Sequence, residues 1–276
     1  EPPEPPLRIE MTLAVEAYPI AGRFVISRGA KTQAQVVTAI LRAGDAVGRG
    51  ECVPYARYGE SVESVVAAIE GVRGEIEAGA DRAVLQRLLP AGAARNAVDC
   101  AMWDLEAKRS GRPAYEIAGF HRLSPLVTAF TLSVGTPQEM RMAALKAADR
   151  PLLKVKLAGE GDDARLAAVR EGAPHAQLIV DANEAWREET LVAQLDACAR
   201  HGVALVEQPL PAGQDDMLAE IPRPIPICAD ESAHETASLD ALRGRYDAVN
   251  IKLDKTGGLT EALAMAQAAR QMGFEI

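Results

Sequence analysis

Charged residues stand at the ends of successive apolar runs in the second half of the sequence. In chain order they are Lys154 and Lys156, Asp181, Glu207, Asp230, and Lys252. Three carboxylates brought together would repel one another, and a hard divalent cation would remove that repulsion. Oxygen ligands without a nearby histidine or cysteine favour Mg²⁺ over zinc. The pattern therefore predicts a magnesium site on Asp181, Glu207 and Asp230; the alternative is that each acid only caps the helix that follows its run.

The lysines around these acids predict acid–base chemistry. Lys154 and Lys156 are two apart in LLKVKL, so on a strand they point to the same side. A lysine beside a bound cation and partly withdrawn from water has a lowered pKa and can act as a general base. Lys252, which we expect to end a strand further round the sheet, would approach a central substrate from the opposite face. One lysine could then remove a proton from carbon and the other return one, unless the lysines merely pair with the acids.

A repeat of strand and helix must position these residues. From residue 126 onward, short apolar runs alternate with helical stretches; the runs are VTAFTLSVG, LLKVKLAG, AQLIVDAN, GVALVEQPL, IPICADES and AVNIKLDKTGG. Strand alternating with helix predicts parallel βαβ units, and six of them make most of a (β/α)₈ barrel, in which active sites lie at the carboxyl ends of the strands. After a helix over 259–272, GFEI predicts the start of a seventh strand. Because a barrel broken there would expose an unpaired edge, we expect a C-terminally truncated barrel.

The first part of the chain predicts a smaller α+β unit. We expect strands over Leu7–Tyr18 and Ala34–Arg42, with a partner strand at Gly50–Val53 after the turn AGDAVGRG. Helices are expected over Ser61–Ala78 and Ala93–Arg109, where apolar residues recur at helical spacing. The sequence therefore predicts an α+β domain over 1–115 and an incomplete barrel domain over 116–276, with about six βα units and the start of a seventh strand.

Composition narrows the possible partners and the compartment. The 276 residues carry a net charge of −9 without a long basic run, which argues against nucleic-acid binding. No apolar run approaches the length of a membrane span and no signal-peptide pattern occurs, so we expect a cytoplasmic protein that does not bind membranes. The four cysteines lie far apart in the sequence, as expected of reduced thiols. We expect a small-molecule substrate, and a homo-oligomer is compatible with the sequence.

The motifs together resemble those of the enolase superfamily, in its muconate-lactonizing subgroup. They are the K-x-K pair, DAN, VEQP, ADES and NIKLDKTGG, together with the helix NAVDCAMWDLEAKRSG. The resemblance implies a modified TIM barrel of (β/α)₇β type, capped by the N-terminal domain, with Mg²⁺ on the three acids. It implies that Lys156 and Lys252 are the acid/base pair and that Lys154 is an electrostatic neighbour that holds the substrate carboxylate. Asn183 and Glu231, which lie in the same motifs, are expected to support this set.

Two N-terminal segments, RFVISRGAKTQAQVV and GRGECVPYARYGES, are similar to those of dipeptide epimerases, especially the alanyl-glutamate enzymes. The resemblance implies that L-Ala-D-Glu and L-Ala-L-Glu interconvert by 1,1-proton transfer through a metal-stabilised enolate, a step in the use of bacterial cell-wall peptides. Arg28, in a cap loop, is then the candidate for binding the glutamate carboxylate; the alternative is a solvated surface arginine. Thr131, at the end of the first barrel strand, is a candidate for the substrate pocket. The family's acids for the dipeptide amino group lie on a final strand beyond this sequence.

Two other functions are compatible with these residues. A muconate-type cycloisomerase or an o-succinylbenzoate-synthase-like lyase would use the same lysines and acids for a different outcome. A non-catalytic scaffold or binding protein that kept the site is the second alternative. Proton exchange at the substrate α-carbon distinguishes the epimerase from the cycloisomerase and the lyase. A binding protein would keep its biological role in Lys156→Ala, whereas an enzyme would lose its activity.

Overall fold

The computed structural model describes residues 8–276, so Leu7, the first residue of the first predicted strand, lies outside the described residues. The first part of the described chain contains β1 (Glu10–Ile26), β2 (Gly29–Ala43), β3 (Ala46–Cys52), the 3₁₀ helix η1 (Ala56–Tyr58), α1 (Val62–Gly71), α2 (Arg73–Glu77), α3 (Arg82–Leu88), α4 (Ala93–Ser110) and α5 (Ala114–Ile117). The second part contains β4 (Phe130–Leu132), α6 (Pro137–Lys146), β5 (Leu152–Lys156), α7 (Asp162–Gly172), β6 (Gln177–Asp181), α8 (Glu188–Arg200), β7 (Val203–Glu207), η2 (Asp216–Ala219), β8 (Ile227–Ala229), η3 (Thr236–Ser238), α9 (Leu239–Leu242), β9 (Ala248–Val249), α10 (Leu253–Thr256) and α11 (Leu259–Gln271).

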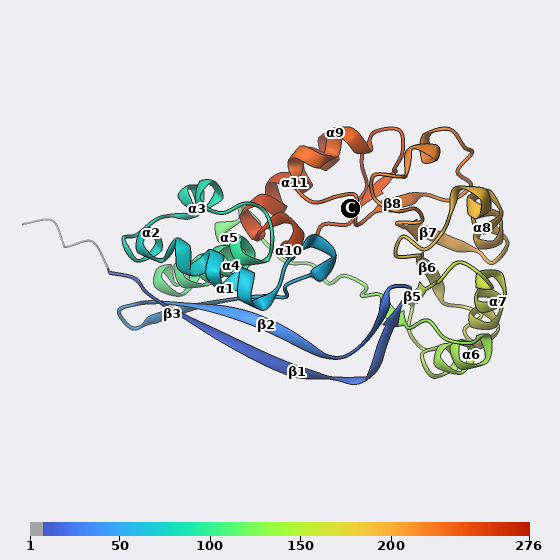
Figure 1. Cartoon of the computed structure of the whole chain (residues 1–276), viewed down its shortest axis with the longest axis horizontal. Coiled ribbons are helices and arrows are strands. Elements are labelled where there is room, and N and C mark those ends of the chain that lie inside the picture. Colours follow the sequence, from blue (N-terminus) through green and yellow to red (C-terminus); the bar gives the residue numbers. More distant parts are fainter. Residues whose placement is uncertain (1–7) are drawn as a thin grey trace, which may run out of the picture.

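The first three strands form an antiparallel sheet in the order β1-β2-β3. The long β1–β2 hairpin begins under the helices α1 to α4 and extends to the second part of the chain, where its tip lies near β5 (Figure 1). The backbone N–H of Val134 donates to the carbonyl of Val25 at 3.1 Å, which fastens the tip beside the start of the second part. Residues Ser27 and Arg28 form the turn at this tip.

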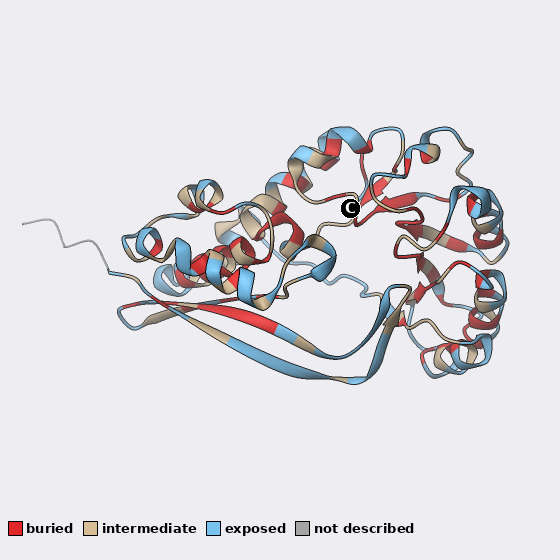
Figure 2. Ribbon diagram, viewed as in Figure 1, coloured by how far each residue is buried: buried red, intermediate tan, exposed pale blue. Residues whose placement is uncertain are grey.

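The predicted strands of the first part exist, but their bounds differ. Strand β1 continues to Ile26, beyond the predicted end at Tyr18, and β2 begins at Gly29, before the predicted start at Ala34. The sequence does not predict these extensions, because this part of the hairpin is exposed (Figure 2) and has no apolar alternation. The third strand was predicted from Gly50 and instead begins at Ala46. Gly44, with φ +59°, and Asp45 make the turn alone, because glycine adopts this left-handed conformation without steric cost.

The predicted helix over Ser61–Ala78 is wrong as a single element, because the chain breaks at Val72 into α1 and α2. The helix predicted over Ala93–Arg109 is confirmed as α4. This helix lies against β3, where Gly50 leaves no room for a side chain: a Cβ there would overlap the carbonyl oxygen of Ala97. Glycine in β3 therefore allows the close helix–strand contact.

The second part is a parallel sheet in the order β4-β5-β6-β7-β8-β9, with helices following the strands as predicted. Its buried strands are visible as the red segments of Figure 2, and its apolar core is one cluster that includes Leu153, Val180 and Ile227. Within GFEI, Glu275 makes a single parallel bridge to Ala248. The predicted fold class is confirmed: an antiparallel capping domain precedes a parallel α/β barrel domain.

The cap has a separate apolar cluster, which joins β1, β2 and β3 to α1 and α4. The division into domains at residues 115 and 116 remains a prediction.

Among the helices of residues 8–276, none combines the length and the apolar character needed to cross a membrane.

Candidate active site

Three buried carboxylates meet at the carboxyl ends of adjacent strands. Asp181 is the last residue of β6, Glu207 is the last residue of β7, and Asp230 directly follows β8. They are 0%, 3% and 2% exposed, and one oxygen of each lies within 4.8 Å of the others. Parallel pairing places Asp181 opposite Glu207, so the two side chains project from the same face of the sheet.

The helix-capping alternative for these acids is wrong. The N-cap positions of the helical elements that follow β6, β7 and β8 are held by Arg187, Asp215 and Glu235, respectively. The Oδ1 atom of Asp181 instead accepts from the backbone N–H of Asn183 at 2.9 Å. The acids are thus not explained by helix termini.

Lys154 and Lys156 share a face of β5, as their spacing predicts, and both reach Asp181. The Nζ atoms of Lys154 and Lys156 lie 3.0 and 2.6 Å from Asp181 Oδ2. Lys154 also lies 2.5 Å from Glu207 Oε2, and Lys156 donates to Asn183 Oδ1 at 3.1 Å. Both lysines therefore form ion pairs with the acids, and these pairs bring their ammonium groups into the carboxylate cluster.

Asp230 is held by two lysines from the other side. Lys252 Nζ lies 2.5 Å from Asp230 Oδ2, and Lys255 Nζ lies 2.7 Å from Asp230 Oδ1. The prediction that Lys252 ends a strand is wrong: β9 ends at Val249, and Lys252 is the cap of α10. The short helix turns Lys255 back onto the same carboxylate. Sequence reasoning gave Lys255 no role, although the K-x-x-K spacing in IKLDK is the signal that could have identified it.

The order of the strands places Lys156 and Lys252 on opposite sides of the three carboxylates. Lys156 comes from β5 and Lys252 from the segment after β9, and the strands that carry the three acids lie between them. The side-chain exposures of Lys156 and Lys252 are 8% and 42%. The arrangement can therefore bring an amine to a central ligand from either side.

The number of ammonium partners sets the direction in which the pKa of each acid is shifted. Burial raises the pKa of Glu207, Asp181 adds to this effect, and Lys154 does not offset it. Burial acts in the same direction on Asp181 and Asp230, but two lysines on each carboxylate outweigh it and lower its pKa. Burial by itself would lower the pKa of Lys154 and of Lys252; their carboxylate partners reverse this and raise both values.

The cluster has the chemistry of a hard-cation site. Its ligand atoms are all carboxylate oxygens, and all three side chains are buried at strand ends that hold them in place. Hard divalent cations take oxygen ligands, and a buried group of three acids is stabilised by positive charge. The donor set therefore fits Mg²⁺.

The tip of the cap hairpin docks onto this site through Asn183 and Glu231. Arg28 Nη1 donates to the carbonyl of Asn183 at 2.9 Å and to Glu231 Oε1 at 2.8 Å. Ser27 Oγ donates to the same carbonyl at 3.0 Å. Arg28 is thus not a freely solvated surface arginine. Thr131 pairs with Lys154 in the parallel register, which places its side chain on the same face of the sheet.

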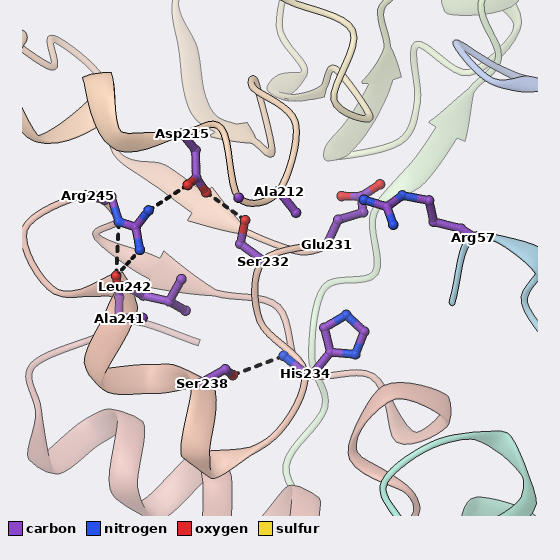
Figure 3. A pocket seen from close by; sticks show the side chains of 11 residues that line it. Arg57, Ala212, Asp215, Glu231, Ser232, His234, Ser238, Ala241, Leu242 and Arg245 are labelled. Atoms are coloured by element: carbon purple, nitrogen blue, oxygen red, sulfur yellow. Dashed lines mark hydrogen bonds and ion pairs between the residues drawn. The ribbon is translucent and has the colours of Figure 1, made fainter. Parts of the chain in front are cut away.

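A pocket of about 460 Å³ adjoins the site on the side of Glu231 (Figure 3). Arg57 and Glu231 extend toward each other at one side of it, and Arg245 lies at the other. Arg245 Nη1 lies 2.6 Å from Asp215 Oδ1, and Asp215 Oδ2 accepts from Ser232 at 2.7 Å. The pocket therefore has both charged and apolar lining residues, and the charged groups on its Arg245 side are already paired with one another.

Two family models match the chain. Residues 8–119 match the mandelate racemase / muconate lactonizing enzyme N-terminal domain, and residues 137–276 match the enolase C-terminal domain-like model. The L-Ala-D/L-Glu epimerase of Escherichia coli (strain K12) is 50% identical over 263 residues, which are 95% of this chain and 82% of that protein. An N-acetyl-D-glutamate racemase of Pseudoalteromonas sp is 45% identical over 249 residues, which are 87% of this chain and 77% of that protein.

Two solved structures also have a fold closely similar to that of this chain. An enolase family member from Agrobacterium tumefaciens with homology to dipeptide epimerases, bound to sodium and L-Ala-L-Glu, superposes with a TM-score of 0.94 at 52% identity, over 98% of this chain and 82% of that one. A dipeptide epimerase from Enterococcus faecalis V583, complexed with Mg and L-Leu-L-Tyr, superposes with a TM-score of 0.89 at 27% identity, over 98% of this chain and 81% of that one.

Proposed function

Because the chain belongs to the enolase superfamily and is an isomerase related to its dipeptide epimerases, we propose that it interconverts the epimers of an L-Ala-D/L-Glu-like dipeptide. One observation carries the proposal: the three carboxylates Asp181, Glu207 and Asp230 meet between Lys156 on one side and Lys252 on the other. A two-base proton transfer at one carbon requires amines on opposite faces of that carbon.

Asp181, Glu207 and Asp230 would hold Mg²⁺. When bound there, the cation supplies positive charge that stabilises the negative charge that develops on the substrate carboxylate as the α-proton leaves. Lys154 holds the same carboxylate from β5 and also contacts Asp181 and Glu207, so it keeps the charge of the cluster balanced.

Lys156 and Lys252 carry the proton transfer in this proposal. Each removes the α-proton of one epimer, and the other returns a proton to the opposite face, so the net change is inversion without loss of atoms. Asn183 accepts from Lys156 and orients its amine toward the substrate side of the cluster. General acid–base help of this kind contributes about 10²- to 10⁴-fold in rate.

Arg28 is the candidate for the side-chain carboxylate of the substrate, and Thr131 contributes to the substrate pocket beside Lys154. Arg28 reaches the site from the hairpin tip and keeps 35% of its side chain exposed. A guanidinium binds a carboxylate through two parallel hydrogen bonds, which suits a glutamate side chain better than an apolar one.

A second candidate substrate is an N-acylated glutamate, because the 45% identical relative is an N-acetyl-D-glutamate racemase. The two substrates share the glutamate carboxylates and the amide, and they differ in the acyl group, which is alanyl with a free amine in one and acetyl in the other. The chemistry at the α-carbon would be the same for both.

Exchange of the α-proton in D₂O tests the function. The protein is incubated with Mg²⁺ and either L-Ala-L-Glu or N-acetyl-L-glutamate, and the glutamate α-proton is followed by NMR. Loss of that signal is the expected result. L-Ala-L-Glu should also give the signals of its other epimer, and formation of the enantiomer of N-acetyl-L-glutamate is followed by optical rotation. The substrate that exchanges faster shows which acyl group the protein prefers. A signal that persists with both compounds would exclude the epimerase and leave the cycloisomerase, the lyase or a binding protein.

Thermal unfolding with added MgCl₂ tests the metal site without reference to activity. A ligand that binds only the folded state raises the unfolding temperature. We expect Mg²⁺ to raise it in the unaltered protein and not in Glu207→Gln. Asp163→Asn, at an exposed acid on α7, is the control and should keep the Mg²⁺ response.

A further inference from the structure

The carboxylate of Glu184 joins two separate segments of the cap to one loop of the barrel. Glu184 lies in the loop after β6, three residues beyond Asp181. Its Oε1 accepts from Arg57 Nη2 at 2.7 Å and from the backbone N–H of Ala212 at 2.9 Å. Its Oε2 accepts from Arg57 Nε at 2.9 Å and from Arg28 Nη1 at 3.1 Å. The four hydrogen bonds use the full acceptor capacity of the carboxylate.

The barrel supplies the backbone turn that carries this side chain. Glu184 and Asn183 have φ values of +67° and +44°, a left-handed conformation that costs non-glycine residues about 1–3 kcal/mol each. The backbone N–H of Glu184 donates to the carbonyl of Gln208 at 2.9 Å, which ties the strained turn to the loop after β7. The side chain of Glu184 is 8% exposed. Glu184 is therefore a buried acceptor at a fixed backbone position, which Arg28 and Arg57 of the cap both contact.

Glu184 binds its two arginines in different ways. Arg57 faces it with both Nε and Nη2, the two-bond geometry that uses one edge of the guanidinium completely. All hydrogen bonds of Arg28 within residues 8–276 go through Nη1, to Asn183, Glu184 and Glu231. The Nε and Nη2 edge of Arg28 thus remains available, and the side chain is 35% exposed.

We propose that Glu184 is a positioning residue for substrate specificity: it holds Arg28 by one nitrogen so that the free edge of the guanidinium faces the side-chain carboxylate of the substrate. The inference rests on the proposed function. Arg57 completes the arrangement, because its two-bond pair keeps the plane of the Glu184 carboxylate fixed. Glu231, the other acid on Arg28 Nη1, keeps that nitrogen pointing inward.

The charge of Glu184 is available for this role at neutral pH. Burial acts to raise the pKa of Glu184, but the hydrogen bonds from Arg57 and Ala212 outweigh it and the pKa lies below its ordinary value. A neutral side chain of the same shape cannot accept from four donors. Glu184→Gln therefore removes the charge and keeps the volume.

The test compares two substrates in one variant. We expect Glu184→Gln to raise KM for L-Ala-L-Glu about 10- to 100-fold, with kcat changed less, because the lost interaction is a charge-assisted one. With L-Ala-L-Ala, which has no side-chain carboxylate, kcat/KM should stay within about threefold. Asp163→Asn, an ion-paired acid on the surface of α7, should leave both substrates unchanged.

Three results would overturn the proposal. Equal losses with both dipeptides would make Glu184 a purely structural clasp, and an unchanged or lower KM for L-Ala-L-Glu would make it a competitor for Arg28. Absence of exchange with both dipeptides in the unaltered protein would overturn the proposed function itself, and with it the role of Glu184. If Glu184→Gln does not fold, Arg57→Met removes the more exposed partner of the same carboxylate. It should give the same substrate-selective rise in KM, about 3- to 10-fold.

Discussion

Lys154 and Lys156 place their ammonium groups 3.0 and 2.6 Å from one oxygen atom, Oδ2 of Asp181. Two like charges this close are tolerated because carboxylates surround them: Lys154 also contacts Glu207, and the side chains of both lysines are largely buried. The repulsion between the two residues of the K-x-K pair is therefore offset within the cluster, and Lys156 is left facing Asn183.

Replacing Lys156 should abolish α-proton exchange from one epimer, and replacing Lys252 should abolish it from the other. If Lys156 and Lys252 act on opposite faces, Lys156→Met will retain α-proton exchange from one epimer only and Lys252→Met from the other. Inversion should fall by about 10²-fold or more in both, because each route needs one amine to remove the proton and one to return it. NMR of each epimer in D₂O measures the exchange. Loss of exchange from the same epimer in both variants would contradict the two-face arrangement.

Lys255 should matter for stability. It is 2% exposed and donates to the side chain and the carbonyl of Asp230 and to the carbonyl of Asn250, all within 2.9 Å. Without Lys255 the buried Asp230 keeps only Lys252, and the carbonyls of Asp230 and Asn250 lose a donor, so Lys255→Met should lower the free energy of unfolding by about 1–3 kcal/mol. Urea denaturation measures this. Lys108→Met, at an exposed pair with Asp104, should cost less than about 1 kcal/mol.

Gly50 should be intolerant of even one carbon atom. A Cβ at this position of β3 overlaps the carbonyl of Ala97 on α4, and the backbone cannot move away without separating helix from sheet. We expect Gly50→Ala to lower the free energy of unfolding by about 1–3 kcal/mol or more. Gly74→Ala is the matched control, because a Cβ there meets no atom within 4 Å. The control should be neutral or up to about 1 kcal/mol stabilising, since alanine favours a helix; a loss equal to that of Gly50→Ala would disprove the packing argument.

The cysteines should be unreactive in the folded chain. All four are free thiols, and Cys52, Cys198 and Cys228 are buried. Burial raises the pKa of Cys52 and of Cys198 to about 12 and that of Cys100 to about 11. Because the thiolate is the reactive form, labelling by a disulfide reagent at pH 8 should be slow and should become faster as the pH rises toward 11. In urea all four should react quickly, and fast labelling of the native protein would contradict this.

Sequence periodicity predicted the elements that bury one or two faces. The parallel strands, α4 and α11 were located because apolar residues recur along them, and Asp181, Glu207 and Lys156 were found at the ends of those strands. This apolar periodicity is absent from the exposed arm of the β1–β2 hairpin. It also could not show the break at Val72, because apolar residues recur at helical spacing across α1 and α2.

The amino-acid sequence by itself determined which charged groups gather at the barrel mouth, because parallel strands carry their last residues to one edge of a sheet regardless of distant contacts. Only the tertiary structure decided how those groups are held. Arg57 and Glu184 are 127 residues apart and Arg28 and Glu231 are 203 apart, so neither strand nor helix spacing relates them. Lys255 joins the site through the four-residue helix α10, which follows β9. Contacts of this kind depend on where the cap docks, and the free energy of docking is spread over buried surface and hydrogen bonds that no local pattern encodes.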